Sequence, residues 1–192
     1  LTVSRSSEVD IRKAFDVDKG AITTIPLGVD TDVFTADAAP ERVSGRIVCV
    51  ASADAPLKGV SYLLEAVAKL GAEREVSLTL VSKLDPDGPS AKLIDDLAIG
   101  DRVNVVSGLE DTELAGLLAS AQVACVPSLY EGFSLPAVEA MSCSTPLVAT
   151  RAGAIPEVVG DAGVIVPPRD SERLAQEIGR LLDDAALREQ VG

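Results

Sequence analysis

Residues 46–82 read RIVCVASADAPLKGVSYLLEAVAKLGAEREVSLTLVS, and this stretch indicates the fold class. It begins with an apolar, β-branched run at 46–51 and ends with another at 76–82, each typical of a strand covered on both faces. Between the two runs, apolar residues recur at the spacing of one helix face: Val60, Leu63, Leu64, Val67 and Leu70. A strand, a helix and a second strand in this order predict a right-handed crossover between parallel strands.

The same alternation of strand-like and helix-like segments continues to the end of the chain. Four further strands are expected at 103–106, 122–126, 146–149 and 164–166. Helices are expected over 111–119, over 134–142, and along an apolar stripe formed by Leu174, Ile178, Leu181 and Leu182. The sequence therefore predicts an α/β domain with a Rossmann-like, doubly wound parallel sheet.

The residues before the first of these strands follow a different pattern. A helix is expected over 8–15, a short strand over 21–26 and a turn at Gly28-Val-Asp30. The polar stretch TADAAPERVS that follows contains a proline and is typical of a linker. We therefore expect a remnant of a preceding domain with an interdomain connection, then a linker, then the Rossmann-like domain, at residues 1–36, 37–45 and 46–192.

Composition excludes several classes of protein. The 192 residues include 17 Lys and Arg against 30 Asp and Glu, a net charge of −13, which argues against nucleic acid or anionic lipid as the main partner. No apolar run approaches the length of about 18 residues that a membrane span needs. The chain has no histidine, so Ser-His-Asp and Cys-His mechanisms are excluded within it. Three cysteines without C-x-x-C spacing fit a reducing, cytoplasmic location.

The loop after the strand expected at 122–126 carries the richest chemistry. Ligands of open parallel sheets bind beyond the carboxyl ends of the strands. Gly132 allows close approach of the backbone, and the amide groups of Phe133, Ser134 and Leu135 open the next helix. A helix start of this kind is expected to bind an anion such as a phosphate.

Two carboxylates flank the expected anion site. Glu131 precedes it, and Glu139 lies in the helix, at a distance of about 7 Å along the axis. Ionised carboxylates only accept hydrogen bonds and therefore suit the hydroxyl groups of sugars. A hydroxyl-bearing ring on each side of a diphosphate describes a nucleotide-sugar. The alternative is that Glu131 is an ordinary loop carboxylate and that Glu139 complements the helix dipole.

Residues 128–141, SLYEGFSLPAVEAM, closely resemble the E-x7-E signature of the retaining GT-B glycosyltransferases of family 4, also called group 1. The resemblance continues at TPLVA (145–149), at AGAIPEVVGDAG (152–163) and upstream at Lys58-Gly59. It implies that the chain is the C-terminal, donor-binding half of a GT-B fold. Members of this family continue past the position of Gly192, so the domain is expected to be truncated at its C-terminus.

The resemblance also implies roles for individual residues. Lys58 is expected to contact the diphosphate of the sugar donor, Glu131 the hydroxyls of its sugar, and Glu139 the ribose, with Glu131 and Lys58 as the catalytic pair. The expected donor-binding residues are Ser52, Lys58, Glu131, Gly132, Phe133, Ser134, Leu135 and Glu139. The base of the nucleotide is expected beside Leu109, Asp111 and Leu114.

The function implied by the resemblance is transfer of a hexose from a UDP-, GDP- or ADP-sugar to an acceptor, with retention of configuration and without metal or cofactor. The acceptor, a sugar, lipid or small molecule, is expected to bind mainly to an N-terminal domain outside this chain, so this fragment alone is expected to be inactive. Two alternatives stay open: a non-catalytic nucleotide-sugar-binding domain, and an epimerase or glycogen-synthase-like enzyme of the same fold. For the full-length protein, peripheral association with the inner membrane face is also open.

The chain departs from the family pattern at Ala53, where an arginine commonly joins the lysine on the diphosphate. Loss of such a charge-assisted contact weakens binding by about 1.5–3 kcal/mol. Three explanations stay open: Ser52 and backbone groups substitute, Arg151 reaches in, or donor binding is weak. Separately, Asp85-Pro-Asp87-Gly88 resembles the metal-binding D-x-D motif of the other glycosyltransferase fold, but its composition is typical of a turn.

Overall fold

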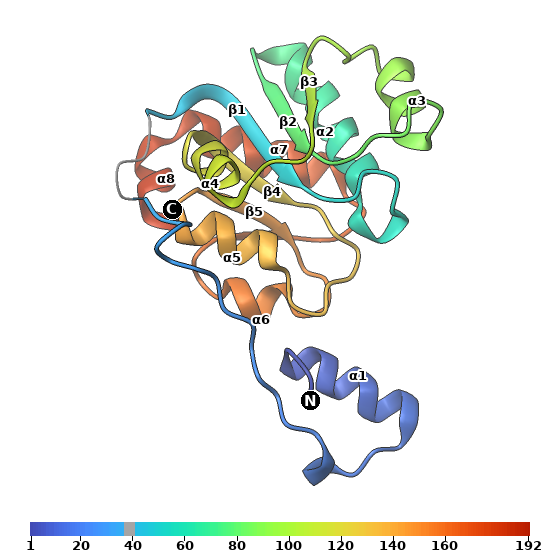
Figure 1. Cartoon of the computed structure of the whole chain (residues 1–192). Helices are drawn as coiled ribbons and strands as arrows, with labels where there is room; N and C mark the ends of the chain where they lie inside the picture. Colours follow the sequence, from blue (N-terminus) through green and yellow to red (C-terminus); the bar gives the residue numbers. More distant parts are fainter. Residues whose placement is uncertain (37–40) are drawn as a thin grey trace.

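The computed structural model describes residues 1–36 and 41–192, whose centre is a six-stranded parallel sheet with helices on both faces (Figure 1). The strands lie in the order β3-β2-β1-β4-β5-β6, with bounds β1 Val43–Val50, β2 Ser77–Val81, β3 Val103–Val106, β4 Ala121–Val126, β5 Leu147–Thr150 and β6 Val164–Val166. β1 pairs with β2 on one side and with β4 on the other, so the order reverses between β1 and β4. The predicted Rossmann-like, doubly wound α/β fold is confirmed.

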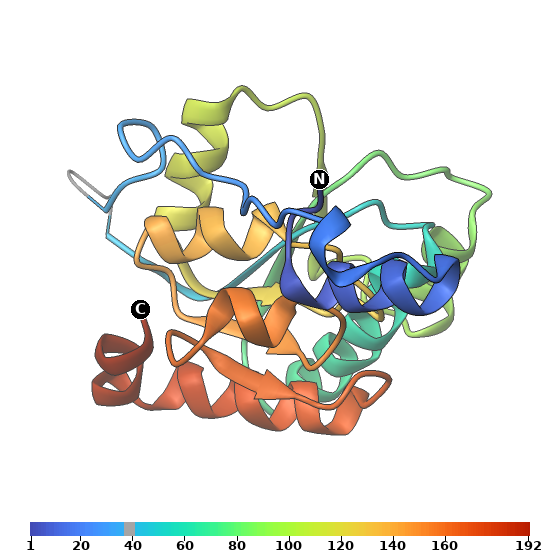
Figure 2. The same ribbon diagram turned by 90° about the horizontal axis from the view of Figure 1, so that it is seen from below.

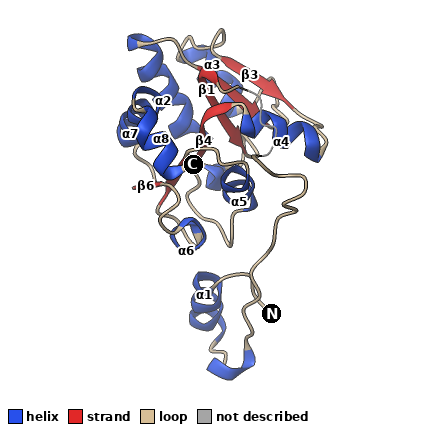
Figure 3. Ribbon diagram, turned by 90° about the vertical axis from the view of Figure 1, so that its left-hand side faces the viewer, coloured by secondary structure: helices blue, strands red, loops and turns tan. Residues whose placement is uncertain are grey.

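The helices form two layers around this sheet. Their bounds are α1 Arg5–Phe15, α2 Val60–Glu73, α3 Pro89–Asp96, α4 Asp111–Ala119, α5 Leu135–Ser142, α6 Ile155–Val159, α7 Ser171–Asp183 and α8 Ala185–Val191. α2, α3 and α7 pack on one face, and α4, α5 and α6 pack on the other (Figure 3). The sequence analysis did not predict the short helices α3, α6 and α8, whose few turns show no clear apolar periodicity.

The central strand supplies side chains to two separate cores. Ile47 and Cys49 point to the layer of α2 and α7, whereas Val48 points to the layer of α4, α5 and α6. All three are almost fully buried, as alternate residues of a strand covered on both faces should be. Burial raises the pKa of the Cys49 thiol to about 12, so this cysteine acts as an apolar core residue.

The strand expected over 21–26 is wrong. Ala21 ends a short 3₁₀ turn, η1 (Lys19–Ala21), and the segment pairs only through an isolated bridge between Thr24 and Thr2. A β-branched run becomes a strand only beside a partner strand, and within the described residues the backbone of 22–26 forms hydrogen bonds only with Thr2.

The linker expected over 37–45 is partly corrected. Residues 37–40 lie outside the described residues, but Val43 to Gly45 already belong to β1. Their backbone is held by neighbours far away in sequence, since the Val43 amide donates to Ser120 O and the Gly45 amide to the Gln122 side chain. The left-handed backbone of Gly45 brings its Cα so close to Glu75 that a Cβ would lie 2.6 Å from that carbonyl oxygen.

The N-terminal helix α1 lies beside α6, away from the sheet (Figures 1 and 2). An extended segment leads from it back to the domain, where buried Phe34 packs into the core below α4 and α5. None of the helices in residues 1–36 and 41–192 is long and apolar enough to cross a membrane.

Candidate functional site

The candidate site lies at the carboxyl ends of β1, β2 and β4, where the strand order reverses. A cavity of about 540 Å³ opens there. It is lined by Val50, Ala51, Ser52, Ala53, Asp54, Ala55, Lys58, Val81, Ser82, Lys83 and Pro136. This is the position at which doubly wound sheets bind their ligands, so the topology by itself points to a small-molecule site.

Lys58 and Glu131 meet at this edge of the sheet. Lys58 Nζ lies 2.8 Å from Glu131 Oε1, and the hydroxyl of Ser128 donates to the same oxygen at 2.7 Å. The Glu131 side chain is only 12% exposed, so the pair is partly shielded from water.

Close backbone contacts bring these two side chains together. Lys58 ends a 3₁₀ turn, η2 (Pro56–Lys58), and Gly59 follows it in a left-handed conformation. A Cβ on Gly59 would lie 2.1 Å from the Pro127 carbonyl oxygen, so only glycine allows this approach. The Leu129 amide then donates to the carbonyl of Leu57 at 2.7 Å.

The backbone of Glu131 is held from its other side as well. Its carbonyl accepts a hydrogen bond from the Ala154 amide at 2.9 Å. A Cβ on Gly153 would lie 2.2 Å from the same carbonyl oxygen, which again leaves room only for glycine. The loop that carries Glu131 is therefore clamped between the start of α2 and the start of α6.

The start of α5 has the properties of an anion site. None of the amide groups of Gly132, Phe133, Ser134 and Leu135 donates a hydrogen bond to another described residue. The Ser134 hydroxyl is buried without a hydrogen-bond partner among the described residues, and Ser134 has a strained, left-handed backbone with a φ of 92°. Buried orphan hydroxyls and strained non-glycine residues persist where a function requires them. These groups are the ones that a phosphate would satisfy.

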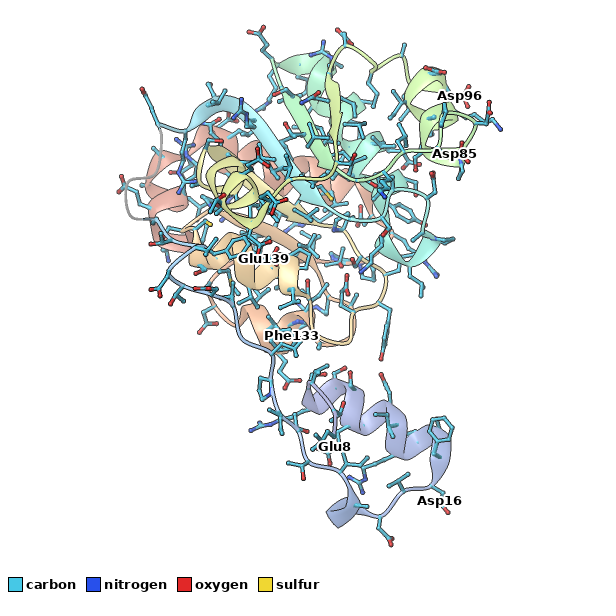
Figure 4. All side chains as sticks on the ribbon, in the orientation of Figure 1. Glu8, Asp16, Asp85, Asp96, Phe133 and Glu139 are labelled. Atoms are coloured by element: carbon cyan, nitrogen blue, oxygen red, sulfur yellow. The ribbon has the colours of Figure 1, made fainter. Side chains whose placement is uncertain are left out.

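Glu139 of α5 and Asp111 of α4 are close enough for their charges to interact. Burial raises the pKa of Glu139, and the negative charge of Asp111 raises it further. Asp111 begins α4, and the half-buried Leu114 packs against the core from the same helix. Glu139 is visible on α5 in Figure 4. One expected base-pocket residue, Asp111, therefore lies near the carboxylate expected to hold the ribose.

The structure adds one cation that the sequence analysis missed. Lys83 lines the same cavity as Lys58 and makes no ion pair within the described residues, whereas Arg151 is not among the lining residues. Ala53 is buried, and its amide donates to the Ser82 hydroxyl. Lys83 directly follows a predicted strand. The rule that ligands bind at the carboxyl ends of parallel strands could therefore have identified it.

The D-x-D sequence forms a turn. The Asp87 amide donates to the Asp85 side chain, and the Gly88 amide donates to the Asp85 carbonyl. Figure 4 shows Asp85 far from Glu139. In the part of the chain that the structure describes, no group of three or more acidic or cysteine side chains gathers as a metal site.

Known proteins share both the sequence and the fold of this chain. Residues 44–184 match the family described as glycosyl transferases group 1. The MMP alpha-(1->4)-mannosyltransferase of Mycolicibacterium hassiacum is 58% identical over 186 residues, which cover 95% of this chain and 45% of that protein. The D-inositol 3-phosphate glycosyltransferase of Mycobacteroides abscessus is 34% identical over 194 residues, covering 95% of this chain and 44% of that protein.

Solved structures extend the comparison. Sucrose-phosphate synthase from Thermosynechococcus elongatus superimposes with a TM-score of 0.82 at 31% identity, over 99% of this chain and 50% of that one. The chain spans about half the length of the curated relatives it matches.

Proposed function

Because this chain belongs to the group 1 glycosyl transferases, we propose that it binds a nucleoside diphosphate sugar and supports transfer of the sugar, with retention, to an acceptor hydroxyl. The start of α5 carries this proposal. It combines unengaged amide groups with a buried, unpartnered Ser134 hydroxyl, and it lies between two carboxylates, Glu131 and Glu139. A diphosphate between two hydroxyl-bearing rings satisfies all of these groups.

Mannose is the proposed sugar. The relative that is 58% identical is named for α-(1→4) mannosyl transfer. Transfer from an α-linked sugar donor to an α-linked product retains the configuration of the anomeric carbon. The nucleoside diphosphate of the proposed donor is GDP, UDP or ADP.

Lys83, which lines the cavity without an ion pair among the described residues, is proposed to contact the sugar donor together with Lys58. Lys58 is paired with Glu131, so this pair contributes no net charge to the cavity. Lys83 makes no ion pair among the described residues, so its ammonium group is available to a diphosphate, while Asp54 in the same lining accepts hydrogen bonds from the amides of Asp85 and Ser90. Ala53 stands where the family commonly has an arginine, and this departure was the reason to consider a binding domain without transfer activity. In our proposal, Lys83 supplies the missing positive charge.

The proposed reaction breaks the bond between the anomeric carbon and the diphosphate oxygen and forms a glycosidic bond to the acceptor oxygen. The proton of the acceptor hydroxyl passes to the departing diphosphate. In this reaction the amide groups of α5 and the two lysines stabilise the charge that develops on the leaving group. Glu131 orients the sugar through its hydroxyls.

Titration calorimetry tests the proposal on the 192-residue chain. GDP, UDP, ADP and their mannose derivatives are titrated in the presence of EDTA. We expect one nucleoside diphosphate and its sugar to bind without metal. The absence of heat with every ligand at millimolar concentration would refute the proposal, and transfer to a mannoside acceptor is then measured with a full-length protein.

A further inference from the structure

The N-terminal helix α1 touches the loop that carries Glu131. The hydroxyls of Ser4 and Ser7 both donate to the carbonyl oxygen of Gly132, at 2.7 and 3.1 Å. Ser4 is also the N-cap of α1, because its hydroxyl accepts a hydrogen bond from the Ser7 amide. One carbonyl of the loop is therefore bound twice by residues from the other end of the chain.

Glu157 holds the start of α1 in this position. This residue lies in α6, and its two carboxylate oxygens accept hydrogen bonds from the amides of Arg5 and Ser6 at 3.0 and 3.1 Å. A carboxylate at a helix start satisfies free amides and interacts favourably with the helix dipole. Further along α1, Asp10 accepts a hydrogen bond from the Tyr130 hydroxyl. Figures 1 and 2 show α1 beside α6.

The bound carbonyl determines where the next amide points. The carbonyl of Gly132 and the N–H of Phe133 belong to the same planar, trans peptide group, so they point in opposite directions. Because the carbonyl faces Ser4 and Ser7, the Phe133 N–H faces away from α1. It is one of the unengaged amides at the start of α5.

The orientation of the peptide group between Gly132 and Phe133 depends on contacts with other parts of the chain. Glycine turns its peptide groups more freely than other residues, and Gly132 is open enough that a Cβ there would meet only the Ser7 hydroxyl, at 3.4 Å. The preceding peptide is fixed separately through the Glu131 carbonyl and Ala154. Within the described residues, the only hydrogen bonds to the peptide between Gly132 and Phe133 come from α1.

We propose that α1 positions the phosphate-binding loop, with Ser4 and Ser7, held by Glu157, fixing the Gly132–Phe133 peptide so that the Phe133 amide faces the sugar donor. This inference rests on the proposed function, because the amide needs a phosphate to bind. Ser4, Ser7 and Glu157 are positioning residues that act through Gly132 and do not touch the ligand.

The first measurement needs no ligand. The carbonyl ¹³C resonance of Gly132 is followed by NMR in the wild type, in Ser7→Ala, in Ser4→Ala/Ser7→Ala and in Glu157→Gln. Loss of hydrogen bonds is expected to move this resonance upfield, most in the double variant. Ser7→Thr keeps a hydroxyl and is expected to restore it. Ser6→Ala is the matched control, because it removes a hydroxyl from the same helix that does not touch Gly132. An unchanged resonance in the double variant overturns the inference.

The second measurement is affinity for whichever of GDP, UDP and ADP binds the wild type most tightly. Weakening by about fivefold is expected in Ser7→Ala and by more in the double variant, on the scale of one lost hydrogen bond. Thermal unfolding in parallel shows whether the sheet domain is intact. Wild-type affinity in variants with a shifted resonance overturns this inference alone, whereas a wild type that binds none of the nucleotides overturns the proposed function as well.

Discussion

Lys58 and Glu131 are 73 positions apart in sequence, and their side chains form an ion pair of 2.8 Å at the edge of the sheet. Lys58 is expected to serve the diphosphate of the sugar donor, whereas Glu131 is expected to serve its sugar. The proposed reaction breaks the bond between the sugar and the diphosphate, so the two residues of this ion pair are expected to bind the two groups that separate.

Glu131→Ala is expected to weaken binding of the nucleotide-sugar but not of the free nucleoside diphosphate. It removes the acceptor for the sugar hydroxyls and leaves Lys58 to the diphosphate, so the nucleotide-sugar loses affinity while the free nucleoside diphosphate does not. Calorimetry with both ligands measures the difference. Equal losses for the two ligands contradict the assigned role.

Glu139→Ala is expected to weaken both ligands alike, by about 1–3 kcal/mol, because both carry the ribose that this carboxylate is expected to bind. The same pair of titrations checks this result. A loss confined to the nucleotide-sugar would place Glu139 at the sugar and not at the ribose.

Glu139→Gln is expected to stabilise the fold at neutral pH. Burial raises the pKa of Glu139 in the folded chain above its ordinary value of 4.5, so ionisation favours the unfolded state. The stability of the wild type relative to the variant is therefore highest below pH 4.5 and falls as the pH rises through the raised pKa. Urea unfolding at a series of pH values tests this, and a difference that does not change with pH contradicts it.

Lys83→Ala is expected to weaken nucleoside diphosphate binding by about tenfold, the scale of a hydrogen bond to a charged group. Lys92→Ala is the matched control, since Lys92 is exposed on α3 and lines the neighbouring cavity, not that of Lys58. The change in net charge is the same in both variants. If both weaken binding equally, the effect is long-range electrostatics and not a contact.

Ser134→Gly is expected to raise stability while it lowers affinity. Glycine adopts the left-handed backbone of this position without strain, which is worth about 1–2 kcal/mol, or about 2–8 °C in melting temperature. The lost hydroxyl is expected to weaken nucleotide binding by about fivefold. Ser134→Ala loses the hydroxyl but keeps the strain, so its melting temperature should stay below that of Ser134→Gly. The reverse order of melting temperatures would contradict the role of strain.

Local sequence patterns were enough to establish the layers of the fold and to indicate a candidate site. Apolar periodicity is local, so runs such as 46–51 and the stripe from Val60 to Leu70 predicted strands and helices that the structure confirms. A parallel sheet brings all carboxyl strand ends to one edge, so the loop before α5 was predicted without knowledge of distances. The run at 21–26 was wrongly predicted to be a strand, because a strand also needs a partner strand beside it. The run itself does not show whether the fold provides one.

The side chains that meet at that edge could be identified only from the three-dimensional structure. The pairing of Lys58 with Glu131, the presence of Lys83 in the cavity and the contact of Ser7 with Gly132 each join residues that are distant in sequence. Such contacts depend on how two loops approach each other, and at Gly59 and Gly153 that approach is so close that a single methyl group would prevent it. Local patterns carry no information about distances of this kind, because these distances are set by the packing of the whole sheet and its helices.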